Sequence, residues 1–158
     1  MEAADRGYGV MKICIVSSCG GHLTEVRRLQ PAYEHLEHFY VLDDFAAVPA
    51  DMAGKTYFMT PFKRDPFRVV LNLWEAIRIL NRHRPDVILS TGAGGVVPFA
   101  LAGRLFFGVR IIYIETLARV VVPSLTGRIM YYLAHRFFYQ WKTLGVYFPK
   151  GEYGGLLL

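Results

Sequence analysis

Cysteine is scarce in this sequence, with only Cys14 and Cys19 among 158 residues. The two lie five positions apart and there is no second pair, which excludes a disulfide framework and a zinc site of the usual spacing. We therefore expect a protein of a reducing, cytoplasmic compartment that holds no metal and no other cofactor.

Charged residues are also few, at 20%, whereas hydrophobic residues make up 53% and aromatic residues 15%. This much apolar side chain excludes intrinsic disorder, because a core of normal depth can form. The length suits one α/β domain and is too short for two. We expect a short extension over residues 1–11, one domain over residues 12–150 and a tail over residues 151–158.

Long uninterrupted apolar runs and a secretory leader are missing as well. Residues 1–10 carry Glu2, Asp5 and Arg6 and lack the basic start and apolar stretch of a signal peptide. The longest uncharged stretch, residues 87–103, contains Gly92, Gly94, Gly95 and Pro98, which punctuate a strand, a loop and a helix start. The sequence thus predicts no transmembrane helix.

Charge of each sign is unevenly placed along the chain. Residues 1–60 hold five basic and eight acidic side chains, whereas residues 61–150 hold thirteen basic and four acidic ones. A basic segment rich in aromatic and aliphatic residues suits nucleic acid or an anionic bilayer surface. Because no nucleic-acid recognition motif is present, the membrane interpretation is favoured and no nucleic-acid partner is expected.

Short apolar runs alternate with segments of helical spacing. Strands are expected at 12–17, 39–42, 57–59, 86–90, 110–114 and 136–140, and helices at 23–33, 67–83, 96–105 and 124–134. Strands that are apolar on both faces and alternate with helices indicate a parallel sheet covered on both sides. The predicted fold class is therefore α/β, doubly wound, with a mainly parallel, Rossmann-like sheet.

Two glycine-rich loops follow strands of this expected sheet, SSCGGH at residues 17–22 and STGAGG at residues 90–95. Ligands of such sheets bind beyond the carboxyl ends of the strands, and free amides at helix starts attract phosphate oxygens. The loops predict an anionic ligand, although they could be simple tight turns. The candidate binding residues are Ser18, Gly20, Gly21, Thr91, Gly92, Gly94 and Gly95. A Walker sequence is absent, and the spacing supports a dinucleotide site only weakly.

Two side chains at these strand ends are candidates for acid–base chemistry. His22 lies at the entry to the first helix, where a neutral imidazole could accept a proton from a hydroxyl, or could simply hold the loop. Glu115 ends an apolar run, and a carboxylate there needs a partner or a solvated cleft. A salt bridge between Glu115 and Arg119 is the structural alternative.

The segment around the long third helix has the composition of a membrane surface, since aromatic and basic side chains are mixed there. The expected membrane-facing residues are Phe62, Lys63, Arg64, Phe67, Arg68, Trp74, Arg78, Arg104, Phe106 and Phe107. The alternative for Trp74 is a place in the core.

Four motifs together carry a family resemblance. They are KICIVSSCGGH at 12–22, RPDVILSTGAGG at 84–95, YIETLARVVVPSLTG at 113–127 and the closing Tyr153-Gly154-Gly155. In this order they resemble the membrane-side subunit of two-component, UDP-sugar-dependent glycosyltransferases of oligosaccharide and exopolysaccharide biosynthesis. The sequence is more distantly similar to the N-terminal domain of the transferase that makes the peptidoglycan lipid precursor.

The resemblance implies half of a GT-B glycosyltransferase, peripheral on the cytoplasmic face of a membrane. It implies a separate donor-binding subunit, a UDP-sugar in the shared cleft and a lipid-linked diphosphate acceptor held by the two glycine loops. By position it makes His22 the first candidate base and Glu115 the second, and Leu156, Leu157 and Leu158 are expected to dock on the partner. A self-contained nucleotide-binding protein and a non-catalytic membrane scaffold are the alternatives.

Overall fold

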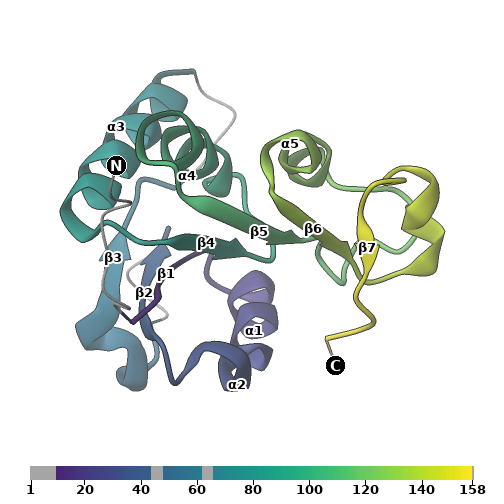
Figure 1. Cartoon of the computed structure of the whole chain (residues 1–158), viewed down its shortest axis with the longest axis horizontal. Helices are drawn as coiled ribbons and strands as arrows, with labels where there is room; N and C mark the ends of the chain where they lie inside the picture. Colours follow the sequence, from purple (N-terminus) through teal and green to yellow (C-terminus); the bar gives the residue numbers. More distant parts are fainter. Residues whose placement is uncertain (1–9, 44–47, 62–65, 158) are drawn as a thin grey trace, which may run out of the picture.

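A single seven-stranded sheet forms the centre of the protein in a computed structural model that describes residues 10–43, 48–61 and 66–157 (Figure 1). The strands are β1 (Lys12–Ser17), β2 (Glu37–Leu42), β3 (Thr56–Phe58), β4 (Val87–Ser90), β5 (Arg110–Ile114), β6 (Arg136–Tyr139) and β7 (Glu152–Tyr153). Their order is β3-β2-β1-β4-β5-β6-β7, and every neighbouring pair is parallel. This confirms the expected parallel α/β architecture.

Helices cover both faces of the sheet. The elements are α1 (Gly21–Arg28), α2 (Gln30–Tyr33), α3 (Pro66–His83), α4 (Val96–Ala102) and α5 (Leu125–Leu133), the 3-10 turns η1 (Ala50–Lys55) and η3 (Lys142–Val146), and the π-helical turn η2 (Gly103–Phe107). In Figure 1, α3, α4 and α5 lie on one face, whereas α1 and α2 lie on the other. The sheet is thus doubly wound, as the alternation of segments predicts.

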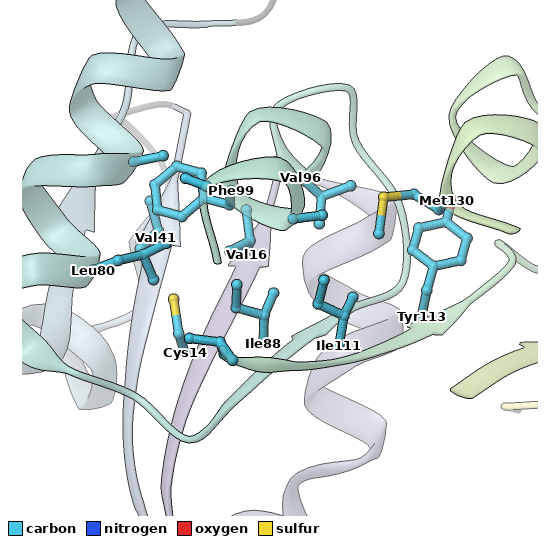
Figure 2. Close-up of a cluster of buried hydrophobic side chains, with 14 of the residues drawn as sticks. Cys14, Val16, Val41, Leu80, Ile88, Val96, Phe99, Ile111, Tyr113 and Met130 are labelled. Carbon is cyan, nitrogen blue, oxygen red and sulfur yellow. The ribbon is translucent and has the colours of Figure 1, made fainter. Parts of the chain in front are cut away.

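Two apolar clusters hold these layers together, one on each face. Successive residues of β1 point to opposite faces, so Cys14 and Val16 join the cluster with α3 and α4, while Ile13 and Ile15 join the cluster with α1. Figure 2 shows the first cluster, in which strand side chains such as Ile88 gather beneath α4. Burial on both faces explains why successive positions in the middle of β1, β4 and β5 are apolar.

The expected helix at residues 23–33 is wrong in one respect, because the structure divides it into α1 and α2 around Leu29. Pro31 supplies the physical reason. Proline has no N–H, so it cannot donate to the carbonyl of Arg27, and its ring crowds the preceding turn. The chain therefore starts a new short helix with proline in its first turn.

The expected helix at residues 96–105 also differs at its end. The chain continues helically through η2 to Phe107, with wider π-type turns, and stops at Gly108 with a φ of 63°. A residue without a Cβ adopts this left-handed conformation readily.

The C-terminal segment is not simply a tail, and the sequence analysis missed β7. Glu152 and Tyr153 pair with β6, and the Arg136 guanidinium binds the Glu152 carboxylate through bonds of 2.6 and 2.7 Å. Arg136 thus fixes the end of the chain against its neighbouring strand. A two-residue strand beside glycines leaves no periodic signal in a sequence.

Some expectations fall outside the described residues, namely those for residues 1–9, Phe62, Lys63, Arg64 and Leu158. Across 10–43, 48–61 and 66–157, none of the helices combines the length and the apolar character needed to cross a bilayer. The same residues contain no group of three or more His, Cys, Asp or Glu side chains arranged to hold a metal ion.

Candidate functional site

An open cleft of about 530 Å³ lies at the carboxyl edge of the sheet, where β4 and β5 lead into their helices. It is lined by His22, Gly92, Ala93, Gly94, Thr116, Ala118, Arg119, Ser124, Leu125 and Thr126. Three loops meet here: the start of α1, the β4–α4 loop and the β5–α5 loop. This is the place where open parallel sheets bind their ligands.

His22 occupies one wall of the cleft as the second residue of α1. Gly20, with a φ of 100°, turns the chain from the preceding loop into the helix. The Thr91 hydroxyl then donates a hydrogen bond of 2.9 Å to the His22 carbonyl oxygen and joins the two glycine loops. His22 Nδ1 is buried and has no hydrogen-bond partner among the described residues. Because Nδ1 is shielded from solvent beside Gly92, only the other edge of the ring can meet a ligand in the cleft.

Gly92 explains how the imidazole fits. Its φ is 143°, and a Cβ at this position would lie 2.3 Å from His22 Cε1 and 2.4 Å from His22 Nδ1. The glycine loop and the histidine thus form one unit, in which the backbone lies directly against the ring. The Ser90 hydroxyl donates to the Gly92 carbonyl oxygen at 2.8 Å and accepts from its N–H at 3.2 Å, which fixes this turn.

The structure divides the predicted binding residues into two groups. Gly92 and Gly94 line the cleft with His22, whereas Thr91 is completely buried and Gly95 packs against Met59. Ser18, Gly20 and Gly21 belong to the α1 loop but do not line the cleft, and both glycines are exposed. Thr91 and Gly95 therefore hold the loop in shape, while their predicted contact with a ligand has no geometric basis.

Glu115 is placed differently from the expectation of a cleft carboxylate. Its side chain is 0% exposed and lies beneath the start of α5, where Oε1 accepts a 3.0 Å hydrogen bond from the Ser124 N–H. Burial raises the pKa of Glu115. Within the described part of the chain it makes no ion pair with Arg119, so the salt-bridge alternative is wrong.

Gly127 on α5 allows this burial. A Cβ there would lie 1.6 Å from Glu115 Oε2, an oxygen that is buried without a hydrogen-bond partner among the described residues. Ser124 caps the same helix by accepting from the Gly127 N–H at 2.8 Å. The motif PSLTG thus combines a helix cap with a space for a buried carboxyl group.

Glu25 is the central residue that the sequence analysis missed. It is only 8% exposed, and its carboxylate accepts hydrogen bonds from the Thr116 hydroxyl (2.7 Å), the Leu117 N–H (3.2 Å) and the Gln140 side chain (3.3 Å). These bonds tie α1, which carries His22, to the β5–α5 loop across the cleft. In the sequence Glu25 resembles an ordinary polar position of an amphipathic helix, so no signal distinguishes it.

The expected membrane-facing side chains largely lie at the surface of α3 and η2, which pack beside each other. Phe67, Trp74 and Phe106 are 86%, 64% and 63% exposed, and Arg78 and Arg104 are exposed as well. The core alternative for Trp74 is therefore wrong. Phe107 differs from expectation, because its ring is half-buried against the core and the Arg84 guanidinium lies 5.2 Å from its centroid.

Comparison with solved structures shows the same fold in longer proteins. The chain superimposes on MurG from Acinetobacter baumannii with a TM-score of 0.66 and 15% identity, covering 84% of this chain and 42% of that one. The superposition on UDP-N-acetylglucosamine 2-epimerase from Rickettsia bellii has a TM-score of 0.70 and 11% identity. It covers 89% of this chain and 42% of that one. The chain thus spans about two fifths of each, which confirms the predicted half of a GT-B fold.

Comparison with curated proteins and family models identifies the relatives. UDP-N-acetylglucosamine transferase subunit ALG14 of Homo sapiens is 26% identical, over 94% of this chain and 83% of that protein. The Candida albicans protein of the same name is 39% identical over 59% of this chain and 44% of its own length. The model for oligosaccharide biosynthesis protein Alg14 like matches residues 49–157. The chain therefore belongs to the Alg14-like family and is a glycosyltransferase subunit of oligosaccharide biosynthesis.

Proposed function

We propose that this chain binds a lipid-linked diphosphate acceptor in the cleft, while a separate subunit binds the UDP-sugar that faces it. The observation that carries this proposal is the open cleft in which His22 and Arg119 lie on different loops of one sheet edge. The family and the match to about two fifths of MurG support a site completed by a second domain. The relatives' name makes UDP-N-acetylglucosamine the first donor to test.

In this proposal His22 serves as the general base. An acceptor hydroxyl attacks the anomeric carbon of the donor sugar, the new C–O bond forms, and the bond to the diphosphate of UDP breaks with its electron pair leaving on UDP. The hydroxyl proton passes to the imidazole of His22, which Gly92 and Thr91 hold in place. The partner subunit would stabilise the departing diphosphate.

Glu115 takes a supporting role in this proposal. Its carboxyl group is enclosed below α5 and does not line the cleft, so it holds the start of α5 through Ser124. It is a positioning residue for the loop that carries Arg119. His22 thereby becomes the favoured base of the two original candidates.

We further propose that α3 and η2 rest on the cytoplasmic face of an anionic membrane. The exposed Phe67, Trp74 and Phe106 suit the headgroup boundary, and Arg78 and Arg104 add positive charge beside them. Each basic side chain near an anionic leaflet contributes about 1 kcal/mol. Several together would hold the protein reversibly without a membrane-spanning helix.

The Arg78→Gln/Arg104→Gln variant should bind anionic liposomes about 30-fold more weakly than the wild-type protein, because two such contributions are lost. Flotation with liposomes that contain phosphatidylserine measures this. A Lys55→Gln/Lys150→Gln variant removes the same charge outside α3 and η2 and should float like the wild-type protein. Equal losses in both variants would contradict a localised membrane surface.

The C-terminal segment offers a surface for the partner subunit. An apolar groove of about 250 Å³ lies along β6 and the residues after β7, lined by Leu29, Ile114, Phe138, Tyr139, Gln140, Gly154, Gly155 and Leu157. Leu157 is already held there, since its N–H donates to Gln140 Oε1 at 2.8 Å and its carbonyl oxygen accepts from Arg28. Leu156 is 39% exposed beside it. We propose that this segment and groove dock on the donor-binding subunit.

Deleting residues 156–158 should abolish co-purification with the donor-binding subunit. Because Leu157 also packs on its own domain, a Leu156→Ser variant provides a milder test and should weaken the complex about tenfold at an unchanged Tm. Val146→Ser, which alters a valine that is 82% exposed on η3, is the control and should leave the complex intact. Normal co-purification of the truncated, folded chain would contradict docking at this segment.

A further inference from the structure

The β5–α5 loop presents an unusual sequence beside the cleft, in which an arginine is followed by three valines. Arg119 lines the cleft, and so does Leu125, the first residue of α5 after this loop. Between them Val120, Val121 and Val122 are 42%, 62% and 49% exposed. The apolar run thus connects two residues of the cleft wall along the chain, and its exposed side chains lie next to that wall without lining the cleft.

The loop that exposes these valines is held firmly. The Leu117 N–H donates to Glu25 Oε2 at 3.2 Å, and the Trp141 indole donates to the Leu117 carbonyl oxygen at 2.8 Å. At the other end the Ser124 N–H donates to Glu115 Oε1 at 3.0 Å. The Thr143 hydroxyl also donates to the Val120 carbonyl oxygen between them. A ligand that covers the valines would thus meet a preorganised surface and cost little loop ordering.

Arg119 supplies the matching charge. It is the only Lys or Arg among the cleft-lining residues, it is exposed, and within the described residues it makes no salt bridge. A guanidinium presents a planar fork of donors that fits phosphate oxygens in a bidentate manner. The loop therefore places a phosphate-binding group directly next to an apolar strip.

We infer that Arg119 and Val120–Val122 bind the junction between the diphosphate and the hydrocarbon chain of the acceptor. The Arg119 guanidinium binds the diphosphate, and the three valines receive the first isoprene units. This inference rests on the proposed function and assigns the substrate class to particular residues of the same cleft. A ligand with an anionic head and an apolar tail fits this loop, because the arginine and the three valines are adjacent in it.

The first test uses the assembled two-subunit enzyme and two water-soluble acceptors. Both carry the same sugar diphosphate, one on a farnesyl chain and the other on a methyl group. In a Val120→Ser/Val121→Ser/Val122→Ser variant, KM for the farnesyl acceptor should rise about tenfold, since the contact with apolar surface is lost. KM for the methyl acceptor should not change, which also shows that the variant is folded. Val10→Ser is the control, because Val10 is 66% exposed and precedes the amino end of β1, whereas the cleft lies beyond the carboxyl ends of the strands.

The second test replaces Arg119 by lysine, which keeps the charge but removes the fork. KM should rise for both acceptors by about tenfold or more, because the bidentate contact to the diphosphate is lost. The two variants are thus distinguished by their KM values. Replacing the arginine should raise KM for every diphosphate acceptor, whereas replacing the valines should raise KM only for acceptors with a hydrocarbon chain.

Several results would overturn the inference. An unchanged ratio of the two KM values in the valine variant would exclude contact with the hydrocarbon. Weaker flotation on liposomes with unchanged KM values would assign the valines to the bilayer, and weaker co-purification would assign them to the partner subunit. If the wild-type pair transferred sugar to neither acceptor, the proposed function itself would fail, whereas normal wild-type transfer with unaffected variants would overturn only this inference.

Discussion

The His22→Ala variant, assembled with its donor-binding partner, should turn over at least about 100-fold more slowly than the wild-type enzyme, because general-base catalysis contributes a factor of this size. The imidazole of His22 lines the cleft, and within the described residues no hydrogen bond engages its Nδ1 atom. The loss should appear in kcat, measured as initial rates at saturating donor and acceptor.

His35→Ala is the matched control, because His35 is exposed on the segment after α2 and is remote from the cleft lining. It should retain wild-type turnover. A fall of only about tenfold in His22→Ala would favour the loop-holding role.

The Gly92→Ala variant should lose both activity and stability. Its φ of 143° is strained for any residue with a side chain, and the new Cβ would lie 2.3 Å from His22 Cε1. We expect a cost of about 1 to 3 kcal/mol in the free energy of unfolding. The displaced imidazole should lower kcat about 100-fold, as small misplacements of catalytic groups do. Thermal unfolding and the transfer assay measure the two effects.

A second substitution separates the two causes of the Gly92→Ala defect. In the His22→Ala/Gly92→Ala double variant the ring is gone, so part of the lost stability should return and the activity losses should not add. Gly54→Ala is the control, since a Cβ there has open space and no unusual φ. Additive losses of stability in the double variant would show that Gly92 does not constrain the histidine.

The architecture was largely predictable from the sequence, because the same physical pattern recurs at each strand. Runs such as residues 13–16 and 111–114 are apolar at every position, and this pattern is typical of strands buried on both faces. Local sequence patterns did not predict the secondary structure where a single residue or a contact with a distant strand determines it. Pro31 breaks a helix that the apolar spacing alone would continue, and β7 exists through its pairing with β6.

The candidate site was predictable only in part. The structure has a cleft at the edge where the glycines after the strands predict a ligand site, since parallel strands bring their carboxyl ends to one edge. Which loop atoms face the ligand depends on packing, so Thr91 and Gly95 were assigned to binding although they are buried. Glu25 and Gln140 were not predicted because their hydrogen bonds join distant segments. Glu25 bonds to Thr116 and to Gln140, which lie 91 and 115 residues further along the chain.

The most direct test of the central claim is an assay of sugar transfer from UDP-N-acetylglucosamine to a polyprenyl diphosphate acceptor. The assay compares this chain alone, the donor-binding subunit alone and an equimolar mixture of the two. The claim is that this chain forms the acceptor wall of a cleft completed by another chain. Transfer should occur only in the mixture. Transfer of sugar by this chain without the second subunit would contradict the account.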